Sequence, residues 1–199
     1  MPIQTAAVAP LTKRPAFAKP VVLVLASGRG ERFAASGGAV HKLRALLAGQ
    51  HVLEHTLTAV RASGLPWHLE DAGHPGMGDS IAAAVRATTD APGWLVLPGD
   101  LPLVQPDTLR TLADALASGC AVVVPEFDGE RGHPVGFAAE CLQDLQALTG
   151  EQGAASVVRK HAQQGRVLRV AVQDEGTVTD VDTVQDLEHA ERLLAARRC

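Results

Sequence analysis

The sequence PVVLVLASGRGERF, residues 20–33, joins an unbroken aliphatic run directly to a turn that contains glycines and arginines. A continuous run of Val and Leu is typical of a strand buried on both faces, as the strands of parallel sheets are. The turn combines exposed backbone amides with basic side chains, which favours the binding of an anion. This stretch therefore predicts a parallel sheet with an anion-binding loop at the end of its first strand.

Strand and helix patterns alternate through the rest of the chain, and Pro106 and Gly119 fit the first position and the end of one helix. Such alternation predicts an α/β fold in which a mostly parallel sheet carries helices on both faces. Ligands of such sheets lie beyond the carboxyl ends of the strands, here in the loops 27–42, 71–79, 99–105 and 173–183. The expected strands are 20–26, 67–70, 94–98, 120–127, 134–139 and 166–172, and the expected helices cover 53–60, 79–89, 106 onward, 140 onward, 153–164 and 183 onward.

Bulk composition limits the classes of function. The chain has 199 residues, a formal net charge of −4, four Phe, two Trp and no Tyr. It therefore lacks the basic surface and the stacking platforms of proteins that bind nucleic-acid polymers. No apolar run is long enough to span a membrane. The three cysteines, Cys120, Cys141 and Cys199, do not have the spacing of metal ligands. We therefore expect free thiols in a reducing compartment.

These features predict the organisation of the chain. Residues 1–19 contain Pro2, Pro10 and Pro15 and no signal-peptide pattern, so we expect a flexible N-terminal tail. Residues 20–199 contain no internal linker or repeat, so we expect a single domain there. We also expect the protein to be cytoplasmic.

The glycine loop matches neither of two familiar phosphate-binding motifs. The dinucleotide fingerprint G-x-G-x-x-G fails because Phe33 stands where the third glycine is required. A Walker A loop fails because Gly37 and Gly38 do not have the required spacing to Lys42, and Leu43 cannot ligate Mg²⁺. What remains is a glycine turn on which arginine and lysine converge, and this suits a triphosphate.

Acidic residues without an evident structural role follow two of the expected strands. Asp100 lies in a Gly-Asp turn directly after a buried strand, too far from Pro106 to cap the next helix. Thr183 and Asp186 form a capping box for the last helix, which leaves Asp180 and Asp182 on one side of an extended segment. Carboxylates opposite a phosphate loop are the ligands of Mg²⁺ when substrate phosphates complete its coordination. The sequence thus predicts a Mg²⁺ site.

Five motifs in order resemble those of the MobA-like nucleotidyltransferases, with the closest similarity to the molybdenum cofactor cytidylyltransferase branch. They are LASGRGERF followed by Lys42, GMGDSIAAAV (76–85), LPGDLPLV (97–104), FDGERGHPVGF (127–137) and VTDVDTVQDL (178–187). The resemblance covers about residues 20–195. It implies a three-layer α/β/α fold of the nucleotide-diphosphosugar transferase type. It also implies transfer of CMP from CTP, or another nucleoside triphosphate, to the phosphate of molybdopterin cofactor, with release of pyrophosphate and a requirement for Mg²⁺.

The resemblance also implies roles for individual residues. Arg32, Lys42 and Asp100 would be catalytic, Asp100 and Asp182 would bind Mg²⁺, and Arg131 and His133 would bind the acceptor substrate. A molybdenum hydroxylase or its maturation chaperone would be a partner. Residue 27 is Ser, which resembles the cytidylyl branch more than the guanylyl branch, where glycine is usual. The nucleotide-binding residues would be Leu25, Ala26, Ser27, Gly28, Gly30, Arg32, Lys42, Gly76, Gly78 and Ser80.

The chain departs from the family pattern at three places. Ser27 replaces the usual alanine, the segment AASGG lengthens the path from Arg32 to Lys42, and the region 64–75 is shorter than usual.

The sequence leaves three alternative functions open. HVLEH (51–55) matches the H-x-x-E-H motif of zinc peptidases. The acceptor could instead be a sugar phosphate or another small phosphate. The chain could also be a catalytically silent protein that binds nucleotide and delivers the cofactor.

Overall fold

The structure is a computed structural model that describes residues 17–197. Most of the expected tail, residues 1–16, and Cys199 lie outside the described residues. The strands are β1 (Val21–Leu25), β2 (Leu46–Leu47), β3 (Gln50–His51), β4 (Trp67–Glu70), β5 (Gly93–Pro98), β6 (Val122–Phe127), β7 (Glu130–Arg131), β8 (Val135–Ala138) and β9 (Val167–Ala171). The helices are α1 (Glu31–Ala35), α2 (Val52–Ser63), α3 (Met77–Ala87), α4 (Pro106–Leu116), α5 (Leu142–Gln146), α6 (Ala155–Gln163) and α7 (Val184–Ala196). Short 3₁₀ turns are η1 (Lys42–Arg44), η2 (Ala139–Cys141) and η3 (Glu175–Thr177).

Within residues 17–197, seven strands form one sheet in the order β4-β1-β5-β8-β6-β7, with β9 also paired to β6. β1 is parallel to β4 and β5, and β6 is parallel to β9. β8 runs antiparallel to both β5 and β6, and β7 is antiparallel to β6. Five of the seven strands therefore share one direction, and the predicted mostly parallel α/β fold is confirmed.

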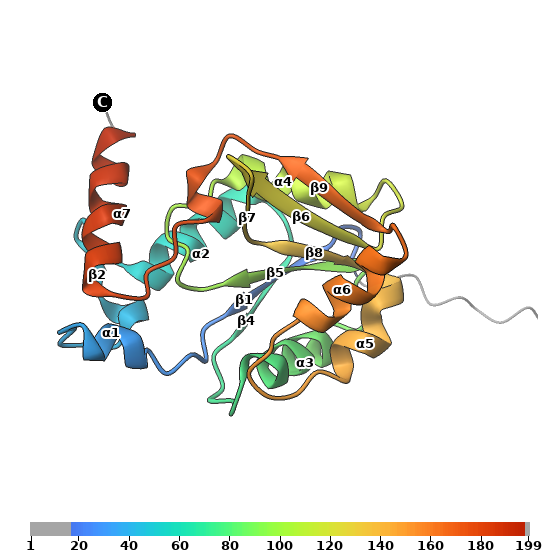
Figure 1. Cartoon of the computed structure of the whole chain (residues 1–199), viewed down its shortest axis with the longest axis horizontal. Helices are drawn as coiled ribbons and strands as arrows, with labels where there is room; N and C mark the ends of the chain where they lie inside the picture. Colours follow the sequence, from blue (N-terminus) through green and yellow to red (C-terminus); the bar gives the residue numbers. More distant parts are fainter. Residues whose placement is uncertain (1–16, 198–199) are drawn as a thin grey trace, which may run out of the picture.

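The central strands are buried on both faces, as the unbroken aliphatic run predicts. On β1, Val21, Leu23 and Leu25 pack toward α3, α5 and α6, whereas Val22 and Val24 pack toward α2 and α4. The two helical layers lie on opposite faces of the sheet, with α3, α5 and α6 in the lower part of Figure 1. This three-layer arrangement is the one that the resemblance implies.

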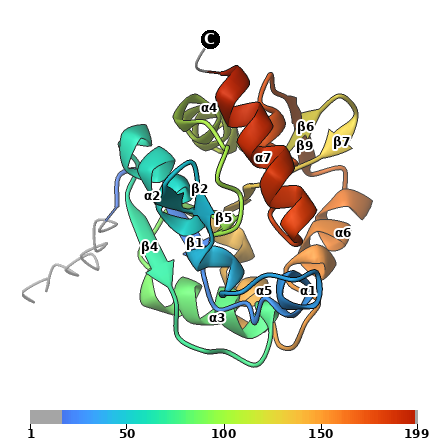
Figure 2. The same ribbon diagram turned by 90° about the vertical axis from the view of Figure 1, so that its left-hand side faces the viewer.

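A third cluster of buried side chains lies at the carboxyl ends of the strands. It joins Phe33 of α1, Leu43 of η1, Leu47 of β2 and Ala190 of α7. In Figure 2 the N-terminal end of α7 lies next to α1, and the Ser36 hydroxyl accepts a hydrogen bond from the Val184 backbone amide at 3.0 Å. This packing fixes the loops around the strand ends, where ligands of such sheets bind.

Most expected elements are present, with differences at their ends. α4 begins at Pro106, and α7 has the Thr183–Asp186 capping box, as predicted. α3 begins at Met77, two residues earlier than expected. α1, the β2–β3 hairpin and β7 were not expected, since each is too short to show a periodic pattern. None of the helices in residues 17–197 combines the length and the hydropathy needed to cross a membrane.

Candidate active site at the carboxyl ends of the strands

Backbone hydrogen bonds bring Asp100 and Asp182 together. The Gly99 amide donates to the Leu25 carbonyl at 2.8 Å, which ties the turn after β5 to the end of β1. The Val181 amide donates to the Asp100 carbonyl at 2.9 Å, which places the next residue, Asp182, beside Asp100. Two segments that are distant in sequence therefore contribute carboxylates to one point, as the sequence predicts.

Lys42 lies between these two carboxylates. Its Nζ is 2.5 Å from Asp100 Oδ2 and 2.6 Å from Asp182 Oδ1. The three side chains are only 12–14% exposed. Burial lowers the pKa of Lys42, but the charges and hydrogen bonds of Asp100 and Asp182 outweigh burial, so the pKa is raised overall. Lys42 is therefore a buried cation held by two anions.

Two further charged side chains lie at this cluster. Arg32 of α1 contacts Asp182 Oδ2 at 2.5 Å, and its side chain is 77% exposed, so it is free to turn toward a ligand. Asp180 lines a separate hollow with other acidic residues rather than the pocket that contains Asp182. Burial and then the charges of Asp182 and Asp100 raise the pKa of Asp180. Asp180 and Asp182 therefore line different cavities, yet the two carboxyl groups lie close enough to interact, as the extended segment suggests.

The loop after β1 has the conformation that its glycines allow. Gly30 has a left-handed backbone with φ of 67°, and a Cβ there would lie 3.2 Å from the His41 ring. The His41 ring in turn bonds the Gly28 carbonyl at 2.7 Å. Ser27 Oγ and Ser80 Oγ are 2.6 Å apart and connect this loop to α3. His41, the sequence neighbour of Lys42, thus connects the start of η1 to the glycine loop.

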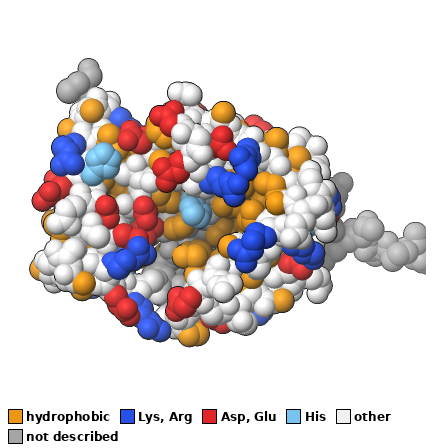
Figure 3. Space-filling view, viewed as in Figure 1, with side chains coloured by type: hydrophobic (Ala, Val, Ile, Leu, Met, Phe, Trp, Pro, Cys, Tyr) orange, Lys and Arg blue, Asp and Glu red, His pale blue; other side chains and the backbone are white. Residues whose placement is uncertain are grey.

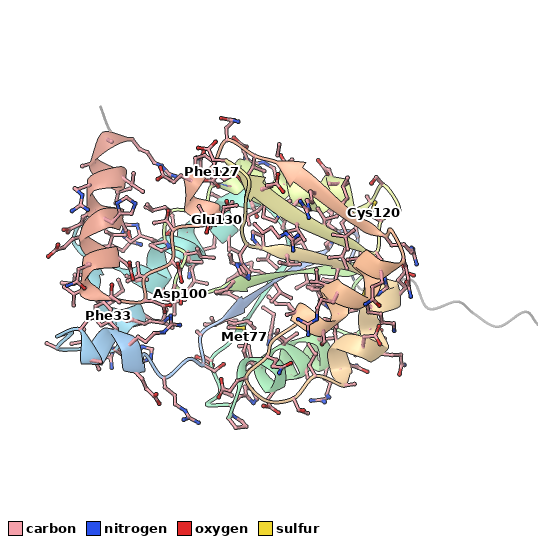
Figure 4. All side chains as sticks on the ribbon, in the orientation of Figure 1. Phe33, Met77, Asp100, Cys120, Phe127 and Glu130 are labelled. Atoms are coloured by element: carbon pink, nitrogen blue, oxygen red, sulfur yellow. The ribbon has the colours of Figure 1, made fainter. Side chains whose placement is uncertain are left out.

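A cavity of about 380 Å³ lies between the glycine loop, the start of α3 and the Asp100–Asp182 cluster. Figure 4 labels Asp100, Met77 and Phe33, which come from three of the elements around it. Of the residues predicted to bind the nucleotide and the metal ion, Ala26 and Gly78 do not line this cavity. Those that do are Leu25, Ser27, Gly28, Gly30, Arg32, Lys42, Gly76, Ser80, Asp100 and Asp182. Arg29, His74, Pro75 and Met77 also line the cavity; they lie in the predicted ligand loops 27–42 and 71–79 but were not predicted individually. Pro98, at the end of β5, was missed.

Gly76 and Gly78 have a packing role that the sequence does not reveal. The loop around Gly150 crosses the N-terminal end of α3, and the Gly78 amide donates to the Gly150 carbonyl at 2.7 Å. A Cβ on Gly76 would lie 2.3 Å from the Gly150 carbonyl carbon, and one on Gly78 would lie 2.8 Å from the Thr149 carbonyl oxygen. Both glycines therefore let two backbones approach closely at the wall of the cavity.

A second cavity, of about 440 Å³, adjoins the first and shares Leu25, Met77 and Pro98 with it. Apolar residues from α3, β5, β6, β8 and α6 form most of its wall, and Arg131, His133 and Arg159 also line it. Figure 3 shows hydrophobic side chains in the hollow at the centre of this face, next to a histidine and bordered by basic side chains. Sequence analysis missed Arg159, because it lies on a helix with no motif.

The predicted acceptor residues Arg131 and His133 therefore line the second cavity rather than the first. The His133 side chain is exposed within the open cavity, yet the protein atoms around it desolvate the ring. This desolvation lowers the pKa of His133, and the Asp100 carboxylate opposes the change only in part. A neutral imidazole thus faces the second cavity near the carboxylate cluster.

The carboxylate cluster suits a divalent cation. Asp100 Oδ1 is buried and has no hydrogen-bond partner, and an unpaired carboxylate oxygen is a free ligand for a metal ion. In residues 17–197 no group of three or more His, Cys, Asp or Glu side chains is arranged to hold a metal ion. Asp100 and Asp182 are thus of the kind that binds Mg²⁺ together with substrate phosphates and water.

The histidines of the HVLEH segment are engaged elsewhere. A ring nitrogen of His51 lies 2.7 Å from the Arg44 carbonyl oxygen, and one of His55 lies 2.8 Å from the Leu47 carbonyl oxygen. Glu54 pairs with Arg61 at 3.1 Å. α2 begins at Val52, so His51 precedes the helix. The His51 ring connects β3 to η1, and the His55 ring connects α2 to β2. The arrangement does not support a zinc peptidase.

Comparison with protein families gives one matching domain. The model of the MobA-like NTP transferase domain matches residues 58–166, more than half of the chain, and this segment includes Asp100 and His133. Among curated proteins, the bifunctional protein GlmU of Stenotrophomonas maltophilia is 28% identical over 186 residues. The match covers 81% of this chain but only 38% of that relative, so the chain spans well under half of the relative's length.

Solved structures show the same fold. A nucleotidyl transferase from Methanothermobacter thermautotroptrophicus, Mth528, superposes with a TM-score of 0.73 at 21% identity over 90% of this chain and 99% of that one. Rv0371c from Mycobacterium tuberculosis H37Rv gives a TM-score of 0.71 at 23% identity over 87% of this chain and 98% of that one. The structure of Rv0371c has also been determined as a complex with manganese.

Proposed function

This chain belongs to the MobA-like NTP transferase family, and we propose that it transfers the CMP group of CTP to the phosphate of molybdopterin cofactor. One observation carries the proposal. Two cavities share a wall of Leu25, Met77 and Pro98, and Asp100 lies on the wall of the first cavity. Such a pair of cavities would accommodate two substrates, whose reacting phosphates would meet at the carboxylate cluster.

The reaction requires no nucleophile from the protein. An oxygen of the acceptor phosphate attacks the α-phosphorus of CTP, the bond from that phosphorus to the bridging oxygen breaks, and pyrophosphate leaves with the electron pair. Catalysis then consists of positioning the two substrates and stabilising the negative charge that develops. In our proposal, the basic and acidic side chains at the ends of β1 and β5 both position the substrates and stabilise this charge.

The first cavity would hold the nucleotide. Backbone amides of the glycine loop, with Arg32 and Lys42, would bind the phosphates, because cations and oriented amides stabilise phosphate charge. Ser27, Gly76 and Ser80 would lie near the ribose and base. The choice of CTP rests on Ser27, because a residue other than glycine at this position resembles the cytidylyl branch.

Asp100 and Asp182 would hold a divalent metal ion, Mg²⁺ in our proposal, which would neutralise phosphate charge at the reacting centre. The unpaired Asp100 Oδ1 supports this role. The manganese complex of Rv0371c is a precedent for a divalent metal in this fold.

The second cavity would hold the acceptor. Arg131 and His133 would bind its polar groups, and the apolar wall would contact its ring system. We further propose a single transferase domain over residues 20–199, a cytoplasmic location, and delivery of the product to a molybdenum hydroxylase or its chaperone.

The test is to incubate the protein with CTP, Mg²⁺ and molybdopterin cofactor and to identify the product by mass spectrometry. The proposal predicts a cytosine dinucleotide of the cofactor and no corresponding product from glucose 1-phosphate. A product from glucose 1-phosphate alone would assign the chain to sugar phosphates. Measurable CTP binding without any product would indicate a silent nucleotide-binding protein.

A further inference from the structure

Lys42 occupies the position between the two carboxylates that are the proposed metal ligands. Its ammonium group is within hydrogen-bond distance of both Asp100 Oδ2 and Asp182 Oδ1, and its side chain is 12% exposed. Arg32 takes the remaining oxygen of Asp182. Three of the four carboxylate oxygens are therefore paired with cations of the protein itself.

The charges of this cluster oppose a metal ion that arrives alone. Lys42 and Arg32 already pair with Asp100 and Asp182, so a divalent cation would meet an ammonium at close range between these two carboxylates, to which the nearby Asp180 adds a further negative charge. Like charges at such a distance repel strongly where water is partly excluded. A triphosphate changes this balance, because it brings several negative charges to the same cavity.

Lys42 is anchored between the carboxylates and the glycine loop. Its backbone is fixed in η1, where the neighbouring Leu43 is buried in the cluster at the strand ends. Its side chain runs past Gly30, where a Cβ would lie 3.6 Å from Lys42 Cγ. Lys42 and the glycine loop line the same cavity, so rotation of the side chain end moves Nζ from the carboxylates toward a bound phosphate.

We propose that Lys42 is a built-in counter-ion that keeps the metal site closed in the free protein and opens it when nucleotide binds. Nucleotide draws Lys42 and Arg32 onto its phosphates, and the freed carboxylates then accept the metal ion. Metal and nucleotide therefore bind with positive coupling, and each raises the affinity for the other by the same factor. The inference rests on the proposed metal role of Asp100 and Asp182.

The experiment measures binding of Mn²⁺ to the protein without nucleotide, by the loss of the electron paramagnetic resonance signal of free Mn²⁺. Lys42→Met should bind Mn²⁺ at least tenfold more tightly than the wild type, because the competing ammonium is gone. Lys42→Arg keeps the charge and should bind as weakly as the wild type. Lys160→Met is the matched control, since Lys160 pairs with Asp144 on the surface away from the cavity.

Equal or weaker Mn²⁺ binding by folded Lys42→Met would overturn the proposal. Stoichiometric Mn²⁺ binding by the wild type without nucleotide would also overturn it, even if Lys42→Met does not fold. Failure of the proposed metal role has a different signature. In that case adding Asp100→Asn to the Lys42→Met variant would leave Mn²⁺ binding unchanged. Asp100→Asn alone would likewise bind Mn²⁺ as the wild type does when CTP is present.

Discussion

Replacement of Asp100 by Asn separates the catalytic role of this residue from its structural role. The amide has nearly the shape of the carboxylate and retains an oxygen that can accept a hydrogen bond from Lys42. It removes one of the two anionic ligands proposed for the metal. Lys42 keeps Asp182 as a charged partner at 2.6 Å, so no cation is left buried and unpaired.

The expected magnitudes for stability and rate differ widely. A hydrogen bond to a charged group contributes about 1.5–3 kcal/mol and one to a neutral group about 0.5–1.5 kcal/mol, so the substitution should cost about 1–2 kcal/mol. For a protein of this size 1 kcal/mol shifts the Tm by about 2–4 °C, so the Tm should fall by no more than about 8 °C. Loss of a preorganised group that stabilises developing charge costs about 100- to 1,000-fold in kcat.

The assay is the rate of pyrophosphate release at saturating nucleotide and acceptor, with the Tm measured on the same preparation. Asp107→Asn is the control, because Asp107 is exposed on α4 and pairs only with the nearby Arg110 among the described residues. We expect at least a 100-fold loss for Asp100→Asn and no loss for the control. Turnover of Asp100→Asn within a few fold of the wild type would refute the role of this carboxylate.

Three further predictions concern packing, thiol reactivity and pH. Gly76→Ala should lower the free energy of unfolding by about 1–3 kcal/mol, because its Cβ would lie 2.3 Å from the Gly150 carbonyl carbon; thermal denaturation measures this. Burial raises the pKa of the Cys141 thiol to about 11, so a thiol reagent near neutral pH should modify the half-buried Cys120 and spare Cys141. Because desolvation lowers the pKa of His133, the unfolded chain binds protons more readily, and stability should fall as pH drops from about 7.5 to about 5.5. His133→Gln should reduce that loss of Tm.

Each of these predictions has a matched control. Gly73→Ala adds a Cβ with no atom within 4 Å, so its Tm should match the wild type, and an unchanged Tm for Gly76→Ala would contradict the packing argument. Thiol labelling is best done in a Cys199→Ser background, where modification of Cys141 in folded protein would contradict its burial. His189→Gln replaces an exposed histidine of α7, and an equal effect of both histidine variants would remove the special role of His133.

The helices and strands that the sequence predicts correctly are those whose local sequence pattern matches their burial or their end points in the fold. The aliphatic run of β1 is buried on both faces, and Pro106 and the Thr183–Asp186 pair mark true helix starts. The direction of β8 was not predictable, because it depends on which strands it joins. α1 was missed because five residues show no period, and its place depends on long-range contacts such as the bond from Val184 to Ser36.

The site shows the same division between local and long-range information. Residue type and position after strands indicated Asp100 and Asp182, the glycine turn with its basic residues indicated Lys42, and all three meet in the structure. Their mutual pairing was not predictable, since it depends on distances between segments far apart in sequence. Asp174 is a further example: it is buried and accepts hydrogen bonds from the Gln105 amide and the Thr108 hydroxyl, so it anchors the start of α4 from another loop.

The central claim is transfer of a nucleotidyl group at the carboxylate cluster, and the most direct measurement is pyrophosphate release. Wild-type protein with Mg²⁺ would be given CTP, GTP, ATP or UTP in turn, with and without molybdopterin cofactor. The account predicts release with CTP that depends on the cofactor. No release with any nucleotide in the presence of the cofactor, from protein that binds CTP, would contradict it.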